Sequence, residues 1–378
     1  MSDHGKLRSK VRGCVLGAVL GDAIGSPFEF GPLTRAEALA KGWWIDGLYP
    51  HPAATGPHGV WPRPTTPSAP PPTGTGSDDT RYNWLFLELA AKLSRMPDAR
   101  DLASRYLEIY EQPDSVFPGH AEWTRRQFEY WEGACRGHLG QRSKQLPDLP
   151  PDVLVARGLG FNYPVLSGLI ALTSAGLLYP GRPEEAYTAA FRADFYDIGY
   201  AREAVALLAA GVSMAMAQDV PPQAVFDRLV AMDPLHLGGE FGPPFVMSHL
   251  PQALQAMAGA KSDREAAWAL SVALRAYHPF DAFRALAIAL VATVSAQGDP
   301  LRAILIAANH VGIDENGNLT RFEDIDCYGG IAGAIAGAMA GAEAFPAAML
   351  DQIVESNRLV YGMDLEATIE RFIERCLQ

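Results

Sequence analysis

The fold of this chain is indicated first by GCVLGAVLGDAIG at residues 13–25, where glycine recurs at every fourth position. The stretch lies within residues 6–24, whose apolar spacing predicts a helix. Each glycine costs a helix interior roughly 1 kcal/mol relative to alanine, so four of them should have a reason. A spacing of four aligns them along one side of the helix, and such a ridge lets another backbone come close. Tolerated glycines in a well-packed helix are the alternative interpretation.

The same spacing returns near the other end of the chain, in DIDCYGGIAGAIAGAMAG at residues 324–341. Two glycine ridges suggest two helices in close contact. If they pack together, Asp22 and Glu29 come near Asp324 and Asp326. So many carboxylates cannot share a small space without a cation, because like charges raise each other's pKa or need neutralising.

A third acidic stretch, SDDT at residues 77–80, precedes the apolar run at 82–93. Ser77 is a good N-cap, and Asp78 and Asp79 suit the positive end of a helix dipole. A capped helix start is therefore one interpretation. The other is half of a site for a hard cation, since Mg²⁺ takes oxygen ligands from carboxylates and hydroxyls. We expect this cluster to lie with Asp324 and Asp326.

The totals describe a globular chain of 378 residues that is 48% apolar and 20% charged. Its net charge of −12 argues against a nucleic-acid partner. The four cysteines are far apart and resemble the reduced thiols of a cytoplasmic protein. Residues 1–12 are polar, so we expect no secretion signal. The apolar tracts 280–297 and 328–342 are expected to be buried helices, so no membrane partner is predicted.

Helical spacing covers most of the remaining chain, without alternation typical of strands and without a solenoid repeat. We therefore predict one all-α domain over residues 1–378. The expected helices are 79–95, 101–111, 121–135, 163–178, 183–192, 201–217, 221–232, 251–259, 263–276, 279–296 and 300–311, with closing helices in 343–378.

A loop rich in Pro, Gly and Thr spans residues 50–73 and leads directly into the SDDT stretch. Long loops in compact domains are usually functional or mobile, so it is either a lid over the site or a surface excursion. Other catalytic motifs are missing from the sequence. There is no dinucleotide-binding loop, P-loop or GxSxG elbow, and the nine histidines form no HExxH.

Taken together, GAVLGDAIG at 17–25 with Glu29, SDDT at 77–80, and DID at 324–326 with its Gly/Ala helix resemble the ADP-ribosylglycohydrolase family. This family includes the hydrolases that remove ADP-ribose from dinitrogenase reductase and from arginine or serine side chains. The motifs come in family order and span most of the chain. The resemblance implies an all-α fold, a binuclear Mg²⁺ (or Mn²⁺) centre and hydrolysis of an N- or O-glycosidic bond. The implied metal ligands are Ser77, Asp78, Asp79, Asp324 and Asp326.

Three departures from the family pattern concern the ion and the substrate. Cys327 stands where the family usually has Thr, and a thiol is a poor partner for a hard cation. Cys327 either favours softer ions or is a small buried residue beside a single ion. Residues 313–323 are inserted before the acidic pair. In the middle of the chain, Gly160–Tyr163 and Asp194–Asp197 replace the Gly-Asn-Gly stretch and the Thr-His pair that frame ADP-ribose in many members.

The resulting hypothesis is a metal-dependent glycohydrolase with one or two Mg²⁺ ions, Mn²⁺ being possible. Asp79 or Asp326 would accept the proton of the attacking water, and Glu29 would also act at the reaction centre. Glu29, Asp22 and Asn162 would contact the substrate, which is an ADP-ribosylated group or a smaller nucleoside or nucleotide. The alternative is a non-catalytic metal-binding, nucleotide-binding or structural protein on the same scaffold, and Cys327 favours it. The oligomeric state is left open.

Overall fold

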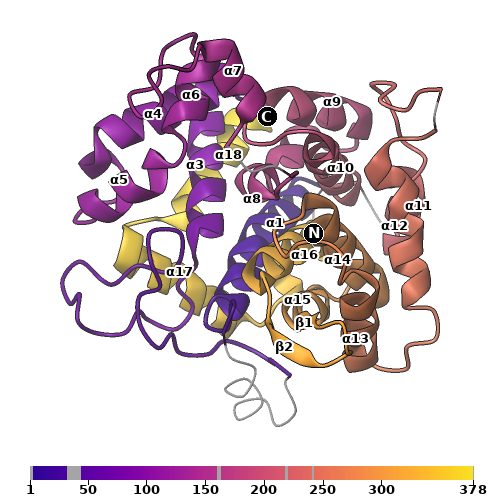
Figure 1. Cartoon of the computed structure of the whole chain (residues 1–378). Coiled ribbons are helices and arrows are strands. Elements are labelled where there is room, and N and C mark those ends of the chain that lie inside the picture. The colour runs from indigo at the N-terminus through magenta and orange to yellow at the C-terminus, as the bar shows by residue number, and fades with distance from the viewer. Residues whose placement is uncertain (1–2, 32–43, 160–162, 218–219, 241, 378) are drawn as a thin grey trace.

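The computed structural model describes residues 3–31, 44–159, 163–217, 220–240 and 242–377. Its fold is all-α, as predicted (Figure 1). The first half of the chain contains α1 (Asp3–Gly25), α3 (Asp78–Leu93), α4 (Ala99–Glu111), η1 (Pro113–Ser115), α5 (Ala121–Glu129), α6 (Glu132–His138), α7 (Pro151–Arg157), α8 (Ser167–Ala171), η2 (Ala175–Leu178) and α9 (Pro183–Ala193).

The second half is also helical apart from one short hairpin. It contains α10 (Tyr200–Ala215), α11 (Pro222–Leu229), α12 (Phe245–Ala256), α13 (Asp263–Ala273), α14 (Ala282–Ser295), α15 (Pro300–Ala308), β1 (Val311–Ile313), β2 (Leu319–Phe322), α16 (Ile325–Ala340), η3 (Ala342–Ala344), α17 (Ala347–Tyr361) and α18 (Leu365–Cys376).

Helices α1 and α16 lie side by side in antiparallel order at the centre of the molecule (Figure 1). Their glycine ridges face each other at backbone contact. A Cβ atom built on Gly21 would lie 2.1 Å from the carbonyl oxygen of Gly329, and one built on Gly17 would lie 2.3 Å from that of Gly333. Side chains cannot occupy such positions, so the predicted contact between the ridges is confirmed. The end of α1 therefore lies beside the start of α16.

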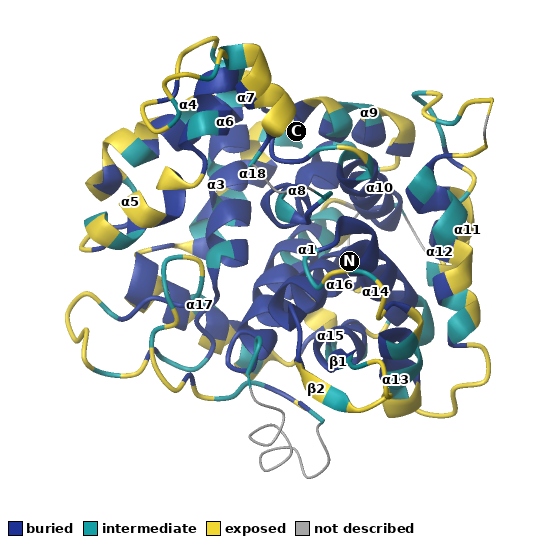
Figure 2. Ribbon diagram, viewed as in Figure 1, coloured by how far each residue is buried: buried dark blue, intermediate teal, exposed yellow. Residues whose placement is uncertain are grey.

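Helix α16 is buried on all sides, from Ile325 to Ala338. Helices α10, α14 and α15 pack against it, and α14 is itself buried over most of its length (Figure 2). A helix that is apolar all round is expected in a core, so both apolar tracts are buried helices as predicted. Among the described residues, no helix has the length and apolarity that a membrane span requires.

The sequence did not predict the hairpin of β1 and β2, which pair antiparallel between Val311 and Phe322. Its strands of three and four residues are too short to show an alternating pattern. The turn is stabilised by Asp314, whose carboxylate accepts hydrogen bonds from the backbone N–H groups of Asn316 and Asn318. The inserted residues 313–323 therefore supply the turn and the second strand of this hairpin. The helix predicted over 300–311 ends at Ala308.

Three other predicted helices differ from the structure by more than their end residues. Residues 121–135 form two helices that are separated at Tyr130 and Trp131, where the buried Trp131 donates its indole N–H to Tyr82. Over 163–178 only α8 and η2 are helical, since Pro164 favours extended backbone before it and Val165 pairs with Asp281. Helix α12 begins at Phe245, ahead of the predicted start at 251, and the Glu203 carboxylate accepts its first backbone N–H groups.

Candidate functional site

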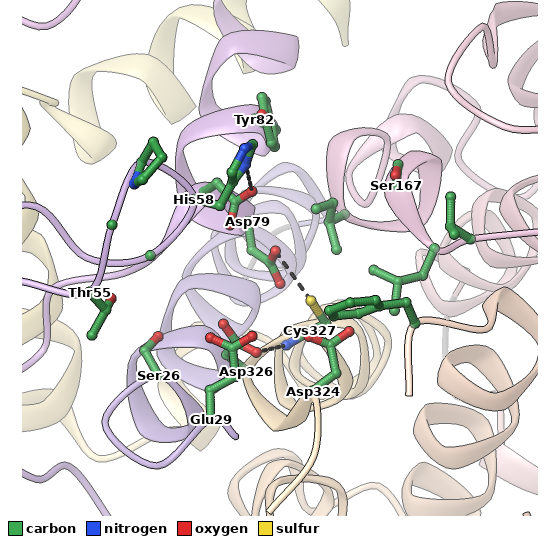
Figure 3. A pocket seen from close by; sticks show the side chains of 18 of the residues that line it. Ser26, Glu29, Thr55, His58, Asp79, Tyr82, Ser167, Asp324, Asp326 and Cys327 are labelled. Atoms are coloured by element: carbon green, nitrogen blue, oxygen red, sulfur yellow. Dashed lines mark hydrogen bonds and ion pairs between the residues drawn. The ribbon is translucent and has the colours of Figure 1, made fainter. Parts of the chain in front are cut away.

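The three acidic stretches meet at one pocket of about 560 Å³ (Figure 3). Glu29 follows the end of α1, Asp78 and Asp79 begin α3, and Asp324 and Asp326 stand at the start of α16. The α1–α16 contact brings the first and last of these stretches together. The clusters therefore lie together, as the sequence predicts. The pocket is lined by Ser26, Glu29, Phe30, Thr55, Gly56, Pro57, His58, Gly59, Asp78, Asp79, Tyr82, Tyr130, Trp131, Val165, Leu166, Ser167, Ile170, Phe280, Asp324, Asp326 and Cys327.

Two sets of donor atoms in this pocket are close enough to hold an ion. One carboxylate oxygen each of Glu29, Asp324 and Asp326 lie within 4.8 Å of one another. So do one oxygen each of Asp79 and Asp326 and the sulfur of Cys327. Asp326 belongs to both sets, so its carboxylate would be a ligand whichever set held an ion. The first set consists of oxygen ligands of the kind that Mg²⁺ binds.

The carboxylates of the pocket have few hydrogen-bond donors for their burial. Asp79, Asp324 and Asp326 are buried, and Oδ2 of Asp324 has no hydrogen-bond partner among the described residues. Burial, and then the charge of Asp326, raises the pKa of both Asp79 and Glu29 well above the usual range. Burial raises the pKa of Asp324 to about 7. A divalent cation would supply the missing positive charge, so these residues fit such an ion.

Asp22 is buried in a different setting, behind the first turn of α3. Its carboxylate accepts hydrogen bonds from the backbone N–H groups of Ser77 and Thr80 and from the hydroxyls of Ser26 and Thr80. Ser77 is equally buried, and its hydroxyl accepts the N–H of Asp79 at 3.3 Å, as an N-cap does. Neither Asp22 nor Ser77 is among the residues that line the pocket.

One wall of the pocket is residues 55–59, part of the Pro-rich loop. The Arg81 guanidinium donates hydrogen bonds to the carbonyl groups of Pro57 and Gly59 and stacks 4.0 Å from the ring centroid of the buried Trp61. This part of the loop is therefore packed against α3. It places His58 beside Asp78, with 3.2 Å between Nδ1 and Oδ2.

Aromatic side chains also line the pocket. Phe30 and Phe280 meet edge to face with centroids 5.4 Å apart, and His58 and Tyr130 do so at 5.4 Å. Sequence reasoning did not identify these four residues. They come from four separate segments and belong to no motif, so only their place in the fold reveals them.

The altered middle region contributes less to the described pocket than expected. Asn162, a predicted substrate contact, lies outside the described residues. Asp194 and Asp197 are buried and do not line the pocket. Asp197 instead accepts the backbone N–H of Gly168 at 2.8 Å, next to Ser167, which does line it.

Comparisons with known proteins agree with this arrangement. A solved structure described as an ADP-ribosylglycohydrolase-related protein complex matches 98% of this chain and 99% of its own, with a TM-score of 0.56 and 20% identity. At that identity the likeness concerns the fold alone. No curated protein matches the sequence. The family model for ADP-ribosylglycohydrolase matches residues 3–378. The chain therefore belongs to the ADP-ribosylglycohydrolase family, and a glycohydrolase-like activity is what this membership supports.

Proposed function

We propose that this protein is a metal-dependent glycohydrolase that cleaves the bond at the ribose anomeric carbon. Its substrate would be an ADP-ribosylated group or a related nucleoside or nucleotide. The observation that carries the proposal is the convergence of carboxylates from three distant segments on one pocket, with fewer hydrogen-bond donors than their burial requires. Such an arrangement disfavours the metal-free charged state and suits a bound cation.

The ion ligands would come from Asp78, Asp79, Asp324 and Asp326, with Glu29 beside them and the Ser77 hydroxyl at the α3 start. One or two Mg²⁺ ions would fit, and Mn²⁺ prefers the same oxygen donors. When bound, such an ion would supply charge for holding ribose hydroxyls and for lowering the pKa of a water molecule.

The chain's own carboxylates would carry the proton transfer. Asp79 or Asp326 would accept the proton of the attacking water, since both carboxylates line the pocket in which that water would lie. Glu29 is half-buried at the pocket and would contact the ribose. The negative field of the cluster would also stabilise the oxocarbenium-like transition state of glycoside hydrolysis.

The aromatic walls would receive the group attached to the ribose. Phe30 with Phe280, and His58 with Tyr130, present ring surfaces on which a flat base can stack. Asn162 remains a proposed substrate contact. For Asp22, a direct contact would require the substrate to pass Ser26, so a supporting role behind the site suits its hydrogen bonds better.

A product screen by mass spectrometry tests the proposal. The protein with Mg²⁺ is incubated with ADP-ribosylated peptides and with nucleosides, and released ADP-ribose or ribose is measured. We expect release from at least one class, and its loss in Asp326→Asn. Mg²⁺ binding without turnover of any class would instead support the second candidate, a non-catalytic protein on the same scaffold.

A further inference from the structure

We infer that Cys327 is a direct sulfur ligand, which makes one of two cation positions selective for borderline ions such as Zn²⁺ and Co²⁺ over Mg²⁺. This inference rests on the proposed metal-dependent function and concerns which ions the site accepts. It predicts two unequal positions, one with only oxygen ligands and one with mixed oxygen and sulfur ligands.

The geometry of the mixed set supports a shared ion. The sulfur of Cys327 and single oxygens of Asp79 and Asp326 lie within 4.8 Å of one another. Ligands of one zinc ion lie roughly 3–4 Å apart, because Zn–S and Zn–O bonds are about 2.0–2.3 Å long. Small side-chain rotations would therefore close the set around an ion.

The local backbone holds the sulfur toward the carboxylates. Cys327 follows Asp326 at the start of α16, and its backbone N–H donates to Oδ1 of Asp326 at 2.9 Å. Its thiol donates to Oδ1 of Asp79 at 3.4 Å across the pocket (Figure 3). Replacing this one hydrogen by a cation would join the same two atoms and release the proton to solvent.

A second observation, made on a different side chain, points to an ion in the same pocket. Asp324 is 2% exposed and lines the same pocket, and its Oδ2 has no hydrogen-bond partner among the described residues. A buried carboxylate oxygen without a donor is costly unless an ion binds it. A bound cation would therefore stabilise this cluster. Cys327 would determine which ions bind at one of its positions.

The two sets of donor atoms should prefer different ions. Glu29, Asp324 and Asp326 offer the hard oxygen ligands that Mg²⁺ and Mn²⁺ prefer. A thiolate is a soft ligand, which Zn²⁺ and Co²⁺ bind well and Mg²⁺ binds poorly. Since Asp326 belongs to both sets, it would bridge the two positions.

Titration of the metal-stripped full chain with Co²⁺ tests the inference by absorption spectroscopy. A sulfur-to-cobalt charge-transfer band in the near ultraviolet should appear, saturate with Co²⁺ and persist in excess Mg²⁺. Cys327→Ser and Cys327→Thr should both lose the band. They should also lower Zn²⁺ affinity by at least the roughly tenfold that loss of an outer partner costs, while Mg²⁺ affinity is retained or raised.

Cys376→Ser is the matched control, because Cys376 is a half-buried thiol on α18 that donates to the carbonyl group of Ala90, outside the pocket. It should keep the band. Thermal unfolding of each variant checks the fold, and two different replacements at residue 327 guard against one that misfolds.

The outcomes separate this inference from the proposed function. Co²⁺ binding detected by calorimetry without the band, or a band that survives Cys327→Ser, would overturn the sulfur ligand and leave an oxygen-only metal site in place. Failure to bind both Co²⁺ and Mg²⁺ would overturn the sulfur ligand together with the metal dependence of the proposed function.

Discussion

Buried carboxylates lie on both sides of the first turn of α3, and the two sides differ in how many hydrogen-bond donors these carboxylates have. Behind the turn, Asp22 accepts hydrogen bonds from four donors, two of them backbone N–H groups at the positive end of the helix. In front of it, Asp79, Asp324 and Asp326 share one pocket, and an oxygen of Asp324 has no partner among the described residues. All four residues are buried.

The difference teaches that burial alone does not mark a functional carboxylate. Donors stabilise the charge of Asp22, so it acts as a clamp between the end of α1 and the start of α3. Burial raises the pKa of Asp22, and its donors oppose this rise. Asp79 and Asp326 have fewer donors, and their pKa is raised well above the usual range, first by burial and then by neighbouring carboxylates; a cation would reverse this rise. A buried carboxylate with several hydrogen-bond donors, such as Asp22, has a structural role here. Buried carboxylates with few donors, such as Asp324, indicate a binding site.

The largest effect is expected from Gly21→Ala, which would disturb both sides at once. The new Cβ would lie 2.1 Å from the carbonyl oxygen of Gly329, and backbone cannot move away cheaply. We expect the free energy of unfolding to fall by more than about 3 kcal/mol, the upper range for overpacking, as measured by urea denaturation.

Gly211→Ala is the control, since a Cβ atom built on this buried glycine in the middle of α10 would lie 3.4 Å from a Leu229 methyl group, an ordinary contact. It should be neutral or stabilising by up to about 1 kcal/mol. Equal losses in the two variants would contradict the close backbone contact of α1 and α16.

Asp22→Asn tests the side behind the turn. The amide NH₂ would face N–H donors of Ser77 and Thr80, and the charge that these donors stabilise would be gone. We expect a loss of about 2–3 kcal/mol in urea denaturation, of equal size with and without Mg²⁺.

Asp326→Asn should have the opposite effect on the metal-free protein. Removing one of several repelling carboxylates should leave the free energy of unfolding unchanged or raised. If Asp326→Asn destabilises the metal-free protein as much as Asp22→Asn does, the proposed difference between a structural Asp22 and an ion-binding Asp326 is wrong.

The free energy of unfolding should also depend on pH, with a somewhat smaller change than the Gly21 and Asp22 variants produce. Asp324 has a folded pKa of about 7, above its ordinary 3.8, so the folded state holds a proton that the unfolded state has released. Its stabilising contribution is full at low pH and is lost as the pH rises toward 7. Between about pH 5 and 6.5, this one group should lower the free energy of unfolding by about 2 kcal/mol.

Saturating Mg²⁺ should remove this decline, because the ion favours the charged carboxylates. The comparison of denaturation curves with and without Mg²⁺ isolates the pocket from other titrating groups. If the free energy of unfolding depends on pH in the same way with and without Mg²⁺, the carboxylates in front of α3 do not bind the ion.

Much of this arrangement could be predicted from the sequence, because its signals are local. Glycine at every fourth position predicts the α1–α16 contact, and that contact explains why Glu29 lies close to Asp324 and Asp326. The hydrogen bonds of Asp22 could not be predicted, since its donors Ser77 and Thr80 are more than 50 positions away. The packing of residues 55–59 against Arg81 and the capping of α12 by Glu203 likewise depend on contacts between distant segments.

Calorimetric titration of the metal-stripped protein with Mg²⁺ and Mn²⁺ tests most directly whether the carboxylates in front of α3 form a cation site. We expect binding of at least one ion, with thermal stabilisation at saturation, and affinity at least about tenfold weaker in Asp326→Asn. The absence of both binding heat and stabilisation at saturating metal would contradict the account.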